Sequence, residues 1–245
     1  GCRATTAIDQ LGTSDEDVIR SFIAKILPTL LQKTAKEVVW TAQKAEKGIE
    51  DNLEIKADAE VSSVWKETLI GVNSPKFEAA QFLPNEFNSL TRYNLQNSQI
   101  AWRSLLLTSS KQLDALSGKV LGEASGSFFE PYGVSDPETF LSAVGSELVT
   151  VRFDDEGDET VVIAEIKDLE KLKKSISTEI NFKSQPEKQG TAEIWKSEDK
   201  SLATVFVENK LILGDSESVL KCLQAKESGQ NFAKSEYFQR FTNNN

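Results

Sequence analysis

The stretch SLATVFVENKLILGDSESVLKCL, residues 201–223, decides the fold. Its β-branched and aromatic residues predict two strands, at 201–207 and 211–213, joined by a polar turn. Asp215 or Ser216 follows, and either side chain is suited to cap the exposed amides of a helix that continues to residue 223. The stretch therefore predicts a hairpin that runs directly into an amphipathic helix.

The same order of elements occurs earlier in the chain, around TVVIAEIKDLEKLKKSI at residues 160–176. A strand with alternating apolar residues at 149–153 pairs with a second strand at 160–164 across a polar turn. Asp168 then caps a helix whose apolar residues recur at helical spacing. Duplicated strand–strand–helix units predict an α+β fold, with a largely antiparallel sheet and helices on one face.

Other elements surround these units. Asp136 and Pro137 predict the start of a short helix, because aspartate caps exposed amides and proline is tolerated at the first helical position. Further strands are predicted at 87–95 and 191–195, and two short helices are predicted between residues 100 and 120.

The N-terminal part is predicted to be mainly helical. Thr13 and Glu16 form a capping box before apolar residues that recur at helical spacing up to Leu27. Pro28 interrupts this helix, and apolar residues at the same spacing predict a second helix up to Ile49. The expected organisation is a tether at 1–13, a mainly helical segment at 14–80 and an α+β domain at 81–245.

Four phrases carry a resemblance: FLPNEF at 82–87, FLSAVGSELVTVRF at 140–153, VVIAEIKDLEKLKKSI at 161–176 and SLATVFVENKLILGDSESVLKCL at 201–223. They resemble a bacterial family of extracytoplasmic proteins that is classed only as a domain of unknown function. The resemblance covers residues 82–241 and consists of core and capping patterns, so it transfers no activity. It implies location, because similar proteins usually carry a signal peptide or a lipid anchor.

The composition excludes several classes of protein. The 245 residues include 28 basic and 38 acidic side chains, and the net charge of −10 disfavours binding to nucleic acid. Because there is no histidine, Ser-His and Cys-His nucleophiles and imidazole metal ligands are excluded. No run of apolar residues approaches the length of about eighteen that a transmembrane helix needs.

Cys2 allows two interpretations. Gly1-Cys2 is the junction expected after cleavage of a lipoprotein signal peptide, in which case Cys2 carries lipid and the residues up to Thr13 form a tether. Alternatively, Gly1 is an expression scar before an ordinary cysteine. The first interpretation agrees with the resemblance and predicts an extracytoplasmic protein that is attached to the membrane of the cell envelope through Cys2.

Two turns carry candidate binding residues. Phe128, Phe129 and Tyr132 lie among turn-forming residues and predict a stacking surface for a sugar, a peptide or an apolar ligand, with packing in the core as the alternative. The turn between the strands of the first unit is acidic, and its candidate ligands for a calcium ion are Asp154, Glu156 and Asp158. A solvated acidic loop is the alternative for this turn.

The sequence favours a non-catalytic binding or scaffold protein of the cell envelope, without a cofactor and with a protein, a glycan or a lipid as its partner. Two pairs have the SxxK spacing of Ser-Lys hydrolases, Ser63/Lys66 and Ser197/Lys200, but they lack the accompanying motifs and are expected on the surface. Two alternatives stay open: a carrier of a lipid or another apolar ligand, and a histidine-free hydrolase that uses two carboxylates.

Overall fold

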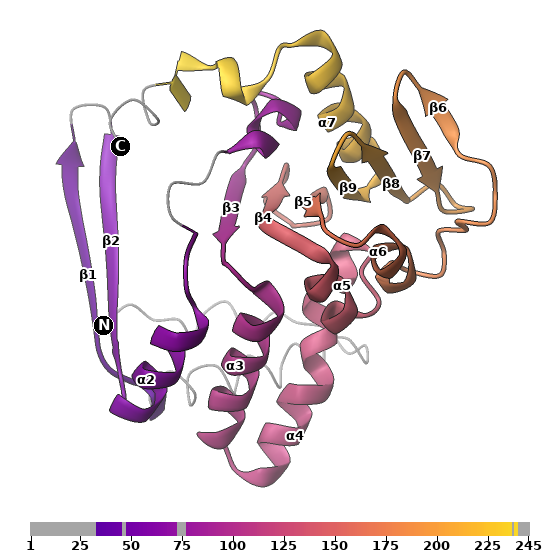
Figure 1. The fold of residues 1–245 in the computed structure, drawn as a ribbon. Helices are drawn as coiled ribbons and strands as arrows, with labels where there is room; N and C mark the ends of the chain where they lie inside the picture. Colours follow the sequence, from indigo (N-terminus) through magenta and orange to yellow (C-terminus); the bar gives the residue numbers. More distant parts are fainter. Residues whose placement is uncertain (1–32, 46–47, 73–76, 237, 240–245) are drawn as a thin grey trace. The chain divides into compact units, whose positions relative to one another are not determined.

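A computed structural model describes residues 33–45, 48–72, 77–236 and 238–239 (Figure 1). The predicted tether, Cys2 and the helix expected up to Leu27 lie outside these residues. The chain divides into two compact units. Unit 1 comprises the described parts of Gly1–Thr68 together with Ile100–Ser125, and unit 2 comprises the described parts of Leu69–Gln99 and Gly126–Asn245.

This division differs from the expected boundary near residue 80. Residues 69–80 belong to unit 2, and the chain returns to unit 1 for Ile100–Ser125 before it completes unit 2. A boundary inferred from composition assumes that each part of the fold is continuous in sequence. Here unit 1 is built from separate stretches, so no single boundary divides the chain.

Unit 2 contains a seven-stranded antiparallel sheet, which confirms the predicted α+β class. The strand order is β3-β4-β5-β9-β8-β7-β6, and the neighbouring strands are antiparallel throughout. The strands are β3 (Ser89–Asn94), β4 (Val144–Arg152), β5 (Thr160–Ile166), β6 (Glu187–Gln189), β7 (Ala192–Lys196), β8 (Leu202–Val207) and β9 (Lys210–Asp215).

The α-helices of unit 2 begin at the aspartates that the sequence predicted. The carboxylates of Asp136, Asp168 and Asp215 each accept a backbone N–H group in the first turn of the helix that follows. Asp215, not Ser216, is therefore the capping residue of the last helix. The helices are α5 (Pro137–Ala143), α6 (Leu169–Ser175) and α7 (Ser216–Ser228).

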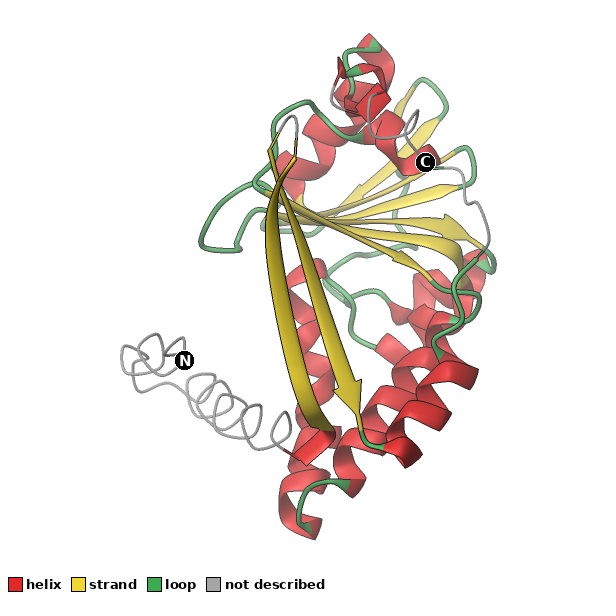
Figure 2. Ribbon diagram, turned by 90° about the vertical axis from the view of Figure 1, so that its left-hand side faces the viewer, coloured by secondary structure: helices red, strands yellow, loops and turns green. Residues whose placement is uncertain are grey.

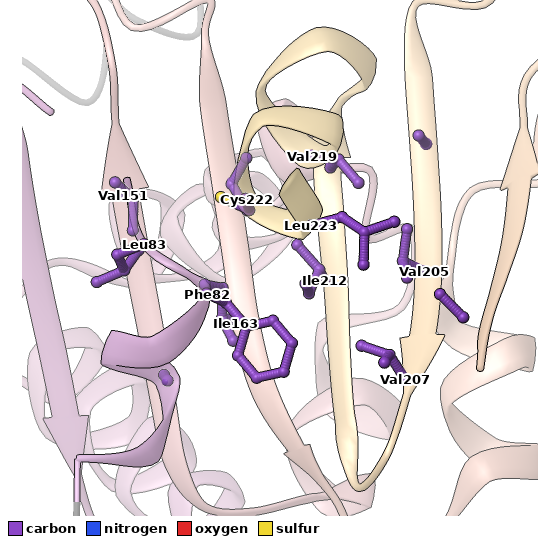
Figure 3. Close-up of a cluster of buried hydrophobic side chains, with 14 of the residues drawn as sticks. Phe82, Leu83, Val151, Ile163, Val205, Val207, Ile212, Val219, Cys222 and Leu223 are labelled. Carbon is purple, nitrogen blue, oxygen red and sulfur yellow. The ribbon is translucent and has the colours of Figure 1, made fainter. Parts of the chain in front are cut away.

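The helices cover both faces of the sheet, so the prediction that they lie on one face is wrong. Val219 and Leu223 of α7 pack in one cluster with Val205 of β8 (Figure 3). Neighbouring residues of a strand point to opposite faces. Phe206 therefore points away from α7, and the ammonium group of Lys173 on α6 lies 5.7 Å from the centroid of its ring. In Figure 1, α7 is drawn above β8 and β9, and α6 below them.

The connections explain why the two repeated units differ. Lys167 and Asp168 both donate their backbone N–H groups to the carbonyl of Ala143 at the end of α5, which draws α6 towards α5. In contrast, α7 begins directly after β9 without a connecting segment. The order strand–strand–helix thus recurs as predicted, but the order does not determine to which face each helix turns.

The face under α7 holds the main hydrophobic cluster of unit 2. Phe82 and Leu83, at the end of the 3₁₀ helix η1 (Glu78–Phe82), are buried in it beside residues of α7 (Figure 3). Burial of a large apolar side chain contributes about 1.5–3 kcal/mol. Because both faces of the sheet are covered, β5 and β9 are buried along most of their length, which explains their nearly continuous apolar runs.

Unit 1 contains an antiparallel pair of strands, β1 (Ala35–Ala45) and β2 (Gly48–Ala57) (Figure 2). A helix up to Ile49 was predicted where β1 and the first residues of β2 lie. That prediction is wrong. Val38, Val39 and Trp40 have β-branched or aromatic side chains that favour strands, and they decide the local structure over the helical spacing. We call this pair, residues 35–57, the ribbon.

The structure describes three further α-helices besides α5, α6 and α7. None of the described helices is long and apolar enough to cross a membrane. The three further helices are α2 (Ala59–Thr68), α3 (Ser98–Lys111) and α4 (Ala115–Ala124). Within unit 1, α2 and α3 are joined by hydrogen bonds from the Trp65 indole to the Thr108 hydroxyl, 3.0 Å, and from the Thr68 hydroxyl to the Ser104 hydroxyl, 2.7 Å.

We expect Gly214→Ala to destabilise unit 2 strongly. Gly214 pairs with Val161 in the centre of the sheet, has a φ of 147°, and leaves no room for a Cβ atom, which would overlap the carbonyl oxygen of Thr160. Urea unfolding followed by circular dichroism should show a loss of about 2 kcal/mol or more. Gly126→Ala is the control, because a Cβ atom there meets nothing within 4 Å. Equal unfolding midpoints for the two variants would contradict the packing of β5 against β9.

Candidate functional site

The predicted aromatic surface is only partly exposed. Phe128 lies in the 3₁₀ helix η2 (Ser125–Phe128) with an exposed fraction of 45%, while Phe129 and Tyr132 are half-buried. Burial raises the pKa of Tyr132, against a hydrogen bond with Thr150 of β4 that lowers it. Tyr132 therefore packs η3 (Glu130–Tyr132) against the sheet. Ligand binding by the three rings stays a prediction.

The acidic turn between β4 and β5 brings the three predicted ligands together. One carboxylate oxygen each of Asp154, Glu156 and Asp158 lies within 4.8 Å of the others. Asp154 also closes the turn, since its two oxygens accept the N–H groups of Gly157 at 2.9 Å and Asp158 at 3.0 Å. Desolvation raises the pKa of Asp154, but the N–H groups of residues 157–159 outweigh it and lower the pKa. Calcium binding stays a prediction beside this structural role.

Ser197, of the second SxxK pair, has a structural role in a turn. Its hydroxyl donates to Asp199 at 2.6 Å and accepts the N–H group of Leu202 at 3.0 Å. Hydrogen bonds from Ser197 and Ser201 lower the pKa of Asp199 to about 2. A hydroxyl that is engaged in this way closes the turn before β8, as the prediction of a turn requires. The prediction that the pair lies on the surface is wrong for Ser197, which is 4% exposed, and holds for Lys200.

A buried ion cluster that the sequence analysis missed lies at one end of β9. The Lys210 ammonium is 2.7 Å from a Glu147 carboxylate oxygen and 3.3 Å from one of Glu78. The side chains of Lys210 and Glu147 are 6% and 7% exposed, whereas that of Glu78 is 53% exposed. Glu147 also accepts the N–H group of Ala79. The cluster thus ties β4 and β9 to the beginning of η1.

The charge balance of this cluster fits a structural role. Burial lowers the pKa of Lys210, but the hydrogen bonds and charges of Glu147 and Glu78 outweigh it, so that the pKa is raised. The lysine therefore stays protonated near neutral pH. Two carboxylates meet here, as in a carboxylate-dependent hydrolase, but they share one ammonium group, and Glu147 is enclosed by its partners. The cluster holds η1, and with it Phe82, on the sheet.

The ribbon presents a second candidate site, an apolar face without a described cover. Register pairs Val38 with Ile55 and Trp40 with Leu53, so these positions lie on one face. The exposed fractions of Val38, Trp40 and Ile55 are 53%, 66% and 46%. Large apolar side chains that gather on one exposed face are typical of a contact surface.

The opposite face of the ribbon is mainly polar, with Val39 as an apolar exception. Glu37 is paired with Lys56 across the strands, and their charged groups are 2.6 Å apart. The Thr41 hydroxyl donates to the carbonyl of Asn52 on the same face. The ribbon is therefore amphipathic, which is the pattern of a strand pair that packs against something on one side only.

Exposed apolar residues are concentrated in unit 1 as a whole. Among the described residues, ten large hydrophobic side chains are exposed, and six of them belong to unit 1. These six are Val38, Trp40, Ile55, Ile100, Leu107 and Leu116. We therefore regard unit 1, and the ribbon within it, as the candidate interaction site.

We expect Lys210→Met to destabilise unit 2, because it leaves the buried Glu147 charge without its cation. The free energy of unfolding in urea should fall by about 3–5 kcal/mol. Lys221→Met is the control, since the pair of Lys221 with Glu159 is exposed and should contribute less than about 1 kcal/mol. The double variant Lys210→Met/Glu147→Gln removes both charges and should recover much of the loss. A double variant no more stable than Lys210→Met would contradict this account.

We expect the Cys222 thiol to be unreactive in the folded chain. Cys222 is fully buried in α7, and burial raises its pKa to about 12, so the reactive thiolate is scarce at pH 8. In a Cys2→Ser variant, a thiol reagent such as DTNB should label Cys222 only after guanidinium chloride unfolds the protein. Rapid labelling of the native variant would show that α7 does not seal the core.

Comparison with known proteins adds no assignment. No protein-family model, no curated protein and no solved structure matches the chain. The resemblance over residues 82–241 therefore stays a prediction.

Proposed function

We propose that the chain is a non-catalytic binding or scaffold protein whose contact surface is the apolar face of the ribbon. Its partner is a protein that offers a complementary apolar surface. The exposure of Val38, Trp40 and Ile55 on one face carries the proposal. Burial of such side chains on binding is favourable by roughly 25 cal/mol per Å² of apolar surface.

The polar clusters of unit 2 support a structural rather than a catalytic role for that unit. Lys210 neutralises the carboxylates that meet at β9, and Asp154 and Ser197 use their oxygens to close turns. Each of these groups is engaged by neighbours of the chain itself. These groups stabilise the fold of unit 2. In contrast, internal packing does not account for the exposed apolar surface of unit 1.

The predicted location belongs to the same proposal. The resemblance over residues 82–241 implies an extracytoplasmic protein, and attachment through Cys2 would hold it at the envelope membrane. A partner for the ribbon would then be a protein of the same compartment.

The test is site-specific cross-linking in the cells that make the protein. A benzophenone amino acid at position 40 should give an adduct with another polypeptide, because Trp40 lies on the apolar face. The control is the same group at Thr41, which lies on the polar face of the same strand. Ile55→Asp should reduce the adduct from position 40. The proposal is wrong if positions 40 and 41 give the same adducts, or if neither gives any.

A further inference from the structure

We propose that unit 2 carries a binding site for a saccharide with a carboxylate group, on the face of β3 and β4 that points away from α7. The site is separate from the ribbon, so it goes beyond the proposed function. It is supported by an exposed tyrosine ring, a row of hydroxyl groups, and an arginine whose charge has no ion-pair partner among the described residues.

Strand register defines the face. Val149 and Val151 of β4 lie in the cluster under α7, and neighbouring residues of a strand point to opposite faces. The residues that alternate with them, and the residues of β3 paired with those, therefore point away from α7. The outermost strand of this sheet is β3, and its side chains on this face are exposed. We call the set the tyrosine face: Ser89, Thr91 and Tyr93 of β3, and Thr150 and Arg152 of β4.

Tyr93 provides a stacking surface. Its side chain is 40% exposed. A tyrosine ring combines a flat apolar body with a polar tip, and the C–H groups on one side of a pyranose ring pack against such a body. Tyr132 of η3 borders the face. Burial is the main cause of its raised pKa, and Thr150, Tyr93 and Arg152 have smaller effects, so its phenol lies near all three.

Hydroxyl groups lie between the ring of Tyr93 and the arginine. Thr91 and Thr150 are directly opposite each other on the two strands, and Ser89 is opposite Arg152. A hydroxyl both donates and accepts hydrogen bonds, as the hydroxyl groups of a sugar do. Tyr93 and Ser89 are four positions apart, which is about 13 Å along the strand. A short oligosaccharide presents hydroxyl groups along such a length.

Arg152 supplies the charge complementarity. Its guanidinium packs against the turn between β4 and β5, where a Cβ atom added at Gly157 would overlap it. Neighbouring acids are engaged elsewhere, since Asp154 accepts two backbone N–H groups and Glu159 pairs with Lys221. An arginine binds a carboxylate through two parallel hydrogen bonds. The fixed guanidinium therefore favours a sugar acid over a neutral sugar.

The size of the tyrosine face favours a small ligand. With two strands about 4.8 Å apart, the face is about 13 Å by 10 Å. A stable protein partner buries about 800 Å² on each side, around a core depleted of charged residues. The tyrosine face is much smaller and holds an arginine among hydroxyl groups. A second copy of the chain or another protein is therefore a poor match for it.

Isothermal titration calorimetry of the purified full chain tests the site. The ligands are the trisaccharides of galacturonic acid and of mannuronic acid, with the neutral trisaccharides of galactose and of mannose for comparison. At least one acidic trisaccharide should bind more tightly than its neutral counterpart. Arg152→Gln should weaken the binding of that acidic trisaccharide about tenfold or more, because it removes hydrogen bonds to a charged group. Tyr93→Ser should also weaken binding, whereas Tyr93→Phe keeps the ring and should retain most of it.

Lys188→Gln is the matched control, because it removes one positive charge from the exposed strand β6 at the other end of the sheet. This variant should bind like the unmodified chain, and circular dichroism should show that every variant keeps the fold. The proposal is overturned if no acidic trisaccharide binds, if acidic and neutral trisaccharides bind equally, or if Lys188→Gln weakens binding as much as Arg152→Gln. Ile55→Asp in the ribbon should leave saccharide binding unchanged, so this test and the cross-linking test fail independently.

Discussion

The pairing of β5 with β9 holds the sheet together. It joins residues 161–165 to residues 210–214 along the central strands, and each of these strands is also one half of a hairpin. This long-range pairing therefore joins β3-β4-β5 to β9-β8-β7-β6, the two parts of the seven-stranded sheet. Gly214 allows the close approach that the pairing requires.

The same strands position the rest of unit 2. On one face they carry the cluster under α7, and on the other face of the sheet the ring of Phe206, on the neighbouring strand β8, lies near Lys173 of α6. At one end of β9, Lys210 and Glu147 fix the beginning of η1. A buried ion pair is weak evidence of net stabilisation, because desolvation offsets the Coulombic gain. Its contribution here is specificity, since it determines where η1 lies on the sheet.

The sequence predicted most of unit 2 because its signals are local. Asp136, Asp168 and Asp215 each stand immediately before an apolar helical pattern, and the structure confirms all three as caps. The face chosen by each helix could not be predicted, because it depends on contacts such as those of Lys167 with Ala143 at the end of α5. Long-range contacts of this kind leave no local pattern.

The wrong prediction for the ribbon and the missed ion pair have similar causes, since each depends on contacts that no local pattern reveals. In the ribbon, apolar residues satisfy a helical spacing and an alternating one at once, and β-branched side chains such as Val38 and Val39 decide in favour of strands. The Glu147–Lys210 pair joins positions 63 residues apart, and the only local signal is a charged residue within or at the start of an apolar strand. The candidate interaction face was missed with the ribbon itself, because its apolar stripe exists only in the strand conformation.

The chain contains a sheet that is covered on both faces and a ribbon with an exposed apolar face, and amide hydrogen exchange of the intact protein tests this difference most directly. Backbone amides of β5 and β9 should exchange last, through global unfolding, because both faces of these strands are covered. Amides of β1 and β2 should exchange faster, and they should slow when a partner binds. Exchange of the ribbon as slow as that of β5 and β9 in the free protein would contradict the account, because the ribbon would then belong to the core.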